Sequence, residues 1–108
     1  MAGRLEGRVA VVTGGSRGIG EAIATAFAAE GARVVVASRK EPGVAAAAAR
    51  INALHPGSTV PMVCHVGKLD TLAEFISNVC ENVGLPDILV NNAGTNPFGV
   101  TTAHTING

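Results

Sequence analysis

A glycine-rich turn between an apolar run and a helix-like pattern is the stretch of this 108-residue chain best suited to chemistry. The turn reads Thr-Gly-Gly-Ser-Arg-Gly-Ile-Gly over residues 13–20 and follows Val-Ala-Val-Val at 9–12. A buried strand, a glycine turn and a helix N-terminus in this order form a cradle for a pyrophosphate. The reason is that the first-turn N–H groups lack partners and the helix dipole adds partial positive charge there. The residues predicted to line this cradle are Gly14, Ser16, Arg17, Gly18, Ile19 and Gly20.

Glycine has two uses in such a turn. Without a Cβ it adopts positive φ, and it lets phosphate oxygens approach the backbone. Gly20 is expected where the helix passes close to the strand. An ordinary strand-to-helix turn is the alternative interpretation of a glycine triplet, and the flanking strand and helix patterns favour the phosphate cradle.

The spacing from Thr13 to Gly20, Thr-Gly-x-x-x-Gly-x-Gly, resembles the nucleotide-binding motif of the short-chain dehydrogenase/reductase family. A second segment, Asn-Asn-Ala-Gly at 91–94, is similar to that family's segment after the fourth strand. The resemblance implies that Asn91 ties neighbouring strands together. It implies that three residues line the cofactor's ribose: Asn92, Ala93 and Gly94.

The end of the second predicted strand bears on which nicotinamide dinucleotide binds. A carboxylate there would bind both ribose hydroxyls, but the sequence has Ser38, Arg39 and Lys40, with Arg17 in the glycine turn. An arginine side chain presents a planar fork that matches phosphate oxygens. This predicts NADP(H) in preference to NAD(H). The alternative interpretation is that these basic residues are solvated surface charges.

At the end of the third strand, His65 and Val66 stand where the family commonly has Asp-Val. Val66 could flank the adenine, and contact by His65 is open.

The family's acid–base residues are missing from this chain. The resemblance implies a serine and a Tyr-x-x-x-Lys beyond the Asn-Asn-Ala-Gly segment, but the chain has no tyrosine and no serine after Ser77. We therefore expect residues 1–108 to be one NAD(P)-binding Rossmann domain, truncated before the catalytic half and holding no catalytic residue. The whole protein would transfer hydride between nicotinamide and a carbonyl or alcohol. The alternatives are a complete, non-catalytic dinucleotide-binding module and, less favoured, a structural fragment without a ligand.

The hydrophobic pattern alternates strand and helix. Strands are expected over residues 8–13, 32–37, 59–66 and 87–91, and the first two helices over 17–30 and 42–54. The third helix is expected to begin at a capping box of Thr71 with Glu74 and to end at Gly84. Short connections place successive strands in parallel. The fold is thus an α/β, Rossmann-type doubly wound parallel sheet, incomplete, and the resemblance implies strand order 3-2-1-4. We expect an unpaired outer edge on the fourth strand and, as a result, marginal stability or association.

Apolar residues at helical spacing define the faces expected to pack on the sheet. They are Ile19, Ile23, Ala26 and Phe27 in the first helix; Val44, Ala47, Ala48, Ile51 and Leu54 in the second; and Leu72, Phe75, Ile76, Val79, Cys80 and Val83 in the third.

Composition excludes several classes of protein. Eight basic and eight acidic residues balance, which argues against a nucleic-acid surface. No apolar run approaches a membrane span, and the first residues lack a signal peptide's apolar core. Cys64 and Cys80 are expected as reduced core thiols of a cytoplasmic protein. The three histidines show no ligand spacing, so no metal is expected, and we expect a homo-oligomer for the full-length form.

Overall fold

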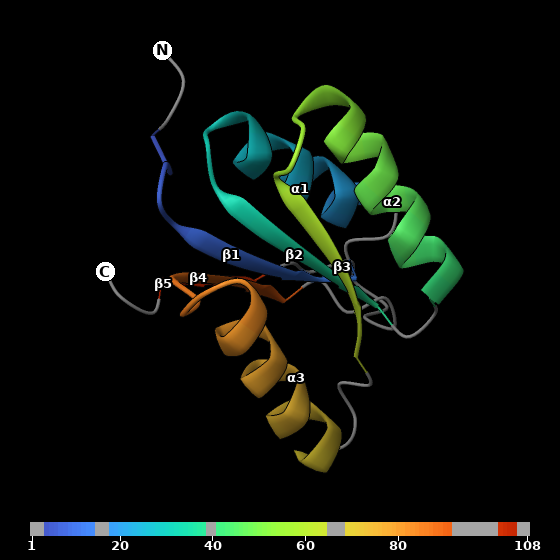
Figure 1. The fold of residues 1–108 in the computed structure, drawn as a ribbon, viewed down its shortest axis with the longest axis vertical. Coiled ribbons are helices and arrows are strands. Elements are labelled where there is room, and N and C mark those ends of the chain that lie inside the picture. Colours follow the sequence, from blue (N-terminus) through green and yellow to red (C-terminus); the bar gives the residue numbers. More distant parts are fainter. Residues whose placement is uncertain (1–3, 15–17, 39–40, 65–68, 92–101, 106–108) are drawn as a thin grey trace.

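The computed structural model describes residues 4–14, 18–38, 41–64, 69–91 and 102–105. Strand and helix alternate along the chain (Figure 1). In chain order the elements are β1 (Val9–Thr13), α1 (Gly18–Ala29), β2 (Arg33–Ser38), α2 (Glu41–Leu54), β3 (Thr59–Val63), α3 (Leu69–Asn82), β4 (Ile88–Asn91) and β5 (Thr102–Thr105).

Within the described residues the strands form one sheet of order β3-β2-β1-β4-β5. The first four strands are parallel and in the predicted order 3-2-1-4. Strands β1 and β2 are almost wholly buried, as expected of a parallel sheet covered on both faces. β3 lies at the edge, where Pro61, which has no N–H to donate, is tolerated.

The three helices cover the two faces of the sheet unequally (Figure 1). One face packs alternate residues of β1 and β2, such as Val12 and Val36, against α1 and α2. The other face packs Val11 and Val35 against α3, through Phe75 and Val79. This division is the one that right-handed crossovers require.

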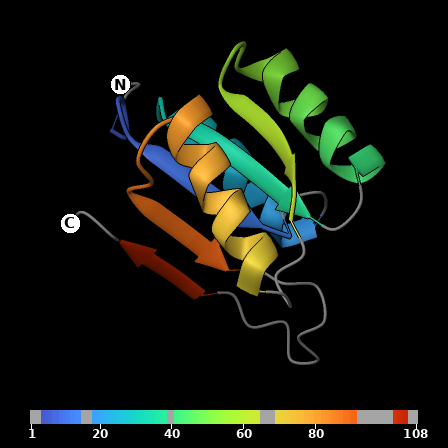
Figure 2. The ribbon, with the colours of Figure 1, turned by 60° about the horizontal axis from the view of Figure 1, so that its bottom comes forward.

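β5 overturns the expectation of an unpaired edge. It pairs antiparallel with β4, from Ile88 opposite Thr105 to Asn91 opposite Thr102 (Figure 2). The prediction was wrong because four residues reading Thr-Ala-His-Thr carry no apolar period, so the pairing depends on backbone hydrogen bonds that the sequence pattern does not reveal. Because β5 covers this edge of β4, the unpaired edge no longer supports the expectation of marginal stability or association.

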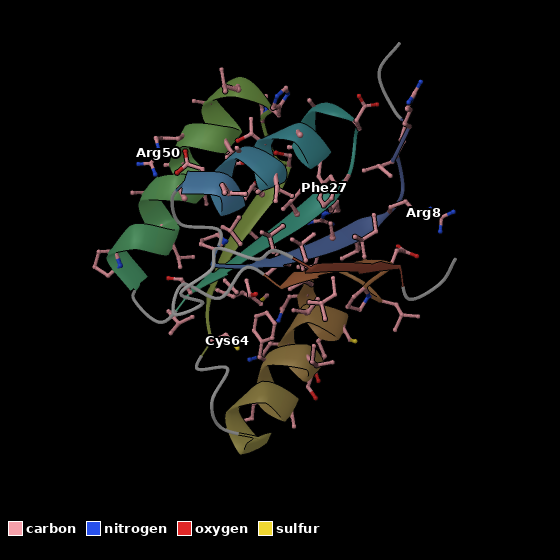
Figure 3. All side chains as sticks on the ribbon, turned by 180° about the vertical axis from the view of Figure 1, so that it is seen from behind. Arg8, Phe27, Arg50 and Cys64 are labelled. Carbon is pink, nitrogen blue, oxygen red and sulfur yellow. The ribbon has the colours of Figure 1, made fainter. Side chains whose placement is uncertain are left out.

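The buried stripe of α1 differs from the predicted one. Gly20, Ala24 and Ala28 are buried, Ile23 and Phe27 pack at the margin of the core, and Ala26 is exposed. Small residues face the sheet because they let the helix axis approach it closely, and the larger Ile23 and Phe27 are only partly buried (Phe27 is labelled in Figure 3).

In α2 the predicted residues Val44, Ala47, Ala48 and Ile51 are buried, but Leu54 is 68% exposed. Leu54 is the last residue of α2, so the apolar stripe of this helix extends beyond the part of the sheet that covers it.

In α3 Phe75 and Val79 are buried, whereas Ile76 and Cys80 are exposed. α3 is the sole helix over its face among the described elements, so only a narrow stripe of it is covered. Cys80 is therefore not a core thiol. Cys64 is buried, and desolvation raises the pKa of its thiol above the ordinary value.

Two element boundaries also differ from expectation. β3 ends at Val63 rather than at residue 66, and α3 begins at Leu69, so Thr71 lies within its first turn instead of capping it. The capping-box prediction was wrong because helix-compatible residues precede the threonine.

Candidate functional site

The candidate site is built on the carboxyl ends of the parallel strands. Thr13 lies opposite Ala37 of β2 and opposite Asn91 of β4. The Thr13 hydroxyl donates to the carbonyl of Val90 at 3.3 Å, and the Gly14 N–H donates to the carbonyl of Ala37 at 2.7 Å. The last residue of β1 is therefore fixed to both neighbouring strands.

This edge contains the point at which the order of the strands reverses. From β1 the chain proceeds through β2 and β3 on one side, and then returns to place β4 on the other side of β1. The helices leaving β1 and β3 accordingly cover opposite faces, as α1 and α3 do in Figure 1. A crevice forms at such a switch point, and open α/β sheets bind their ligands there.

The glycines that border the turn have the predicted conformation. Gly14 has φ of 67° and Gly18 has φ of 64°, both in the left-handed region that favours glycine. A Cβ placed on Gly18 would meet no atom within 4 Å, so open space adjoins the backbone at the first residue of α1. Gly20 is buried, as expected where the helix passes close to the sheet.

The surroundings of Gly18 fit a phosphate group. Its N–H is among the first-turn donors that have no partner within the helix, and no side chain of its own covers it. Ile19, the next residue of α1, is 61% exposed and is not part of the buried face of the helix. Ile19 was predicted both as a core residue and as a lining residue, and its exposure contradicts the first role.

The second half of the predicted site centres on the end of β2. Ser38 is half-buried, and its carbonyl accepts a hydrogen bond from the N–H of Cys64 at 2.9 Å. This contact holds the chain after β3 beside the end of β2. The remaining predicted residues lie outside the described part of the chain, so their roles stay predictions: Ser16, Arg17, Arg39, His65, Val66, Asn92, Ala93 and Gly94.

Asp87, which no sequence motif marked as functional, organises the opposite end of the same strands. Its Oδ2 accepts from the Val9 N–H at 2.9 Å, and its own N–H donates to the Val9 carbonyl at 2.8 Å. Its Oδ1 pairs with Arg8 at 3.3 Å. These contacts set the register of β4 on β1 and thus the position of Asn91 beside Thr13. The signal available in the sequence was an acidic residue, Asp87, directly before the apolar run at 88–90.

A second missed contact joins the first turn of α1 to α2. Arg50 donates from Nε to Glu21 Oε2 at 3.0 Å and from Nη2 to Oε1. These hydrogen bonds hold the pKa of Glu21 below its usual value and raise that of Arg50. Glu21 is thus an ion-paired carboxylate that directly follows the glycine-rich segment. Across the described ranges there is no cluster of three potential metal ligands. None of the helices so described is long and apolar enough to cross a membrane.

Comparison with known proteins agrees with this architecture. The family model for short chain dehydrogenase matches residues 8–107, so the chain belongs to the short-chain dehydrogenase family. The sequence is 43% identical over 103 residues to the human dehydrogenase/reductase SDR family member 2, mitochondrial, which covers 95% of this chain and 36% of that protein. This chain therefore spans about a third of the length of that relative.

Two solved structures share the fold. One is the L-sorbose reductase of Gluconobacter frateurii complexed with NADPH and L-sorbose, with a TM-score of 0.78 and 37% identity over 84% of this chain and 35% of that one. The other is the RhlG/NADP active-site complex of Pseudomonas aeruginosa, with a TM-score of 0.77 and 39% identity over 86% and 37% of the two chains. Members of this oxidoreductase family use nicotinamide cofactors.

Proposed function

We propose that this chain is the cofactor-binding part of an NADP(H)-dependent short-chain oxidoreductase. The observation that carries the proposal is the pair of left-handed glycines, Gly14 and Gly18, at the switch point between β1 and β4. With open space at Gly18, the first turn of α1 would hold the pyrophosphate. Ser38 at the end of β2 would lie beside the adenosine ribose, and three residues after β4 would line the cofactor's ribose: Asn92, Ala93 and Gly94.

The preference for NADP(H) rests on charge. Arg17 and Arg39 supply two guanidinium groups for a 2′-phosphate, and no carboxylate follows β2 until Glu41. Two structures that share the fold are NADP and NADPH complexes, which supports the same preference.

Titration of the 108-residue chain with NADPH and NADH tests this assignment. Replacing Arg39 by Asp together with Arg17→Ala should weaken NADPH binding by about tenfold or more and spare NADH, because the 2′-phosphate loses its charged partners. An equal loss for both dinucleotides would contradict the 2′-phosphate role. Absence of binding of either by the unaltered chain would overturn the proposed function itself.

The chemistry proposed for the whole protein is hydride transfer between nicotinamide and a carbonyl or alcohol substrate. When bound, the nicotinamide supplies or accepts the hydride, and this chain's residues hold and orient the dinucleotide. The chain contains no tyrosine to move a proton. We therefore expect no turnover by the chain alone and propose that it is an N-terminal fragment of an enzyme, cytoplasmic and homo-oligomeric when full-length.

A non-catalytic dinucleotide-binding module is the second candidate, and the absence of tyrosine favours it. Reading the coding DNA beyond the codon for Gly108 separates the two. An open frame that encodes a serine and then Tyr-x-x-x-Lys supports the oxidoreductase. A stop codon directly after Gly108 leaves the binding module.

A further inference from the structure

We propose that Arg50 of α2 is a positioning residue that neutralises Glu21 and thereby keeps the first turn of α1 receptive to the pyrophosphate of a dinucleotide. This inference rests on the proposed function, since it concerns the same phosphate-binding turn. It assigns a role to a pair of side chains outside the glycine motif.

The problem that Arg50 addresses is a misplaced negative charge. Glu21 follows Gly18 by three residues, which places it about 4.5 Å farther along the helix axis. A carboxylate in the first turn satisfies the helix dipole, so it competes electrostatically with any anion bound at the same N-terminus. Without a counter-charge, Glu21 would repel a pyrophosphate held at Gly18.

The structure supplies that counter-charge from the neighbouring helix. The guanidinium of Arg50 meets both carboxylate oxygens of Glu21, in the bidentate arrangement that fixes the orientation of the two groups. The Arg50 side chain lies on the flank of α2 that faces α1 (Figure 3). The Glu21 side chain is 23% exposed and that of Arg50 is 55% exposed, so the carboxylate is the more shielded of the two groups. Glu21 is thereby held toward α2 and its charge is balanced within 3.0 Å.

The charge balance predicts an order of affinities among four proteins. The wild type carries the Glu21–Arg50 ion pair. Arg50→Gln leaves the Glu21 carboxylate without that guanidinium, Glu21→Gln removes the carboxylate, and the double variant removes both charges. At about 0.1 M salt we expect Arg50→Gln to bind NADPH about threefold more weakly than the wild type, because the carboxylate lies within roughly one Debye length of the phosphates. The double variant should bind as the wild type does, and Glu21→Gln at least as tightly.

A purely structural role for the ion pair predicts a different order. All three variants lack the pair, so all three would lose affinity alike if the pair only held α1 against α2. Recovery of NADPH affinity in the double variant supports charge balance, whereas a persistent loss supports the structural role. The unfolding midpoints of all four proteins are measured alongside, to show whether affinity follows stability. At about 1 M salt, where the Debye length is roughly 3 Å, the differences should nearly vanish.

Arg33→Gln is the matched control. It removes one positive charge from an exposed residue at the opposite end of β2, about 17 Å from the carboxyl edge. It should leave NADPH affinity unchanged at 0.1 M salt, within error of the titration.

Three outcomes overturn the inference. They are an unchanged affinity in Arg50→Gln, a loss that persists in the double variant, and a loss of the same size in Arg33→Gln. In each of these cases wild-type binding of NADPH leaves the proposed function standing. A wild type that binds neither NADPH nor NADH overturns both the proposed function and this inference.

Discussion

At its amino end the β1–β4 strand pair is held by a side chain, whereas at its carboxyl end it opens into glycine. Asp87 joins the backbone of Val9 through two hydrogen bonds and pairs with Arg8. At the other end the Thr13 hydroxyl donates to the Val90 carbonyl, and the chain then turns through Gly14. Figure 3 shows Arg8 at the end of β1 that lies away from Arg50.

Along this single pair of strands, the amino end contributes to stability and the carboxyl end to the proposed ligand binding. The amino end uses its backbone groups and a carboxylate to fix register. The carboxyl end leaves first-turn N–H groups and open space at Gly18, which favours an anion but contributes little to the folded state. A structural carboxylate at one end thus positions the proposed binding segment at the other, because β4 is only four residues long.

The largest expected effect on stability comes from breaking the amino end. Asp87→Ala should lower the free energy of unfolding by about 2 kcal/mol, because it removes a charged acceptor and leaves the Val9 N–H without it. Urea denaturation measures the change. Arg8→Gln is the control and should cost less than about 1 kcal/mol, since the Arg8 side chain is 52% exposed. Equal losses in the two variants would show that the salt bridge, rather than the backbone contact, holds the strands.

A pair of glycines sharpens the comparison between binding and stability. Gly18 and Gly57 both have positive φ, 64° and 76°, and a Cβ on either would meet no atom within 4 Å. Alanine at each should therefore cost a similar free energy of unfolding, about 1 kcal/mol, from backbone strain alone. Gly18→Ala should also weaken NADPH binding by about tenfold, because its methyl group covers the N–H aimed at the phosphate.

Gly57 lies in the turn before β3, at the opposite edge of the sheet from Gly18. Gly57→Ala should accordingly leave NADPH binding unchanged while matching the stability loss of Gly18→Ala. Thermal unfolding and dinucleotide titration of both variants provide the measurements. A similar loss of affinity in the two would mean that binding follows overall stability and not the open space at Gly18.

The smallest expected effect is a pH dependence from the ion pair near the carboxyl end. Because the hydrogen bond from Arg50 lowers the pKa of Glu21 below 4.5, the charged carboxylate stabilises the folded state. Its contribution is complete above pH 4.5 and is lost as the pH falls through the lower folded value. The urea midpoint of the wild type should therefore drop slightly more than that of Glu21→Gln between about pH 6 and pH 3.5. Parallel curves would mean that the exposed pair adds no stability.

Much of the fold was predictable because its signals are local. The apolar runs before Gly14 and around residues 33–38 identify buried parallel strands, and Gly31, with φ of 92°, follows the end of α1. The positive φ of Gly14 and Gly18 followed from the glycine spacing alone. The four parallel strands and three helices are therefore a consequence of pattern and handedness.

The faces of the helices were less predictable. Helical spacing indicates which residues share a stripe, but not how wide the covering surface is. Leu54, Ile76 and Cys80 belong to apolar stripes and are nonetheless exposed, because the sheet ends or a single helix lies over it there. In α1 the requirement for close approach selected Gly20 and Ala24 over Ile19.

The sequence by itself determined the strand–turn–helix unit, the conformation of its glycines and the charge available near it, since these depend on neighbouring residues. Only the tertiary structure decided the pairing of β5, the contact of Asp87 with Val9 and that of Arg50 with Glu21. Those contacts join residues far apart in the chain, and their geometry exists only once the crossovers have brought the strands and helices together. No spacing rule along the sequence specifies them, because a charged residue on a helix or strand has many possible partners until the elements are packed.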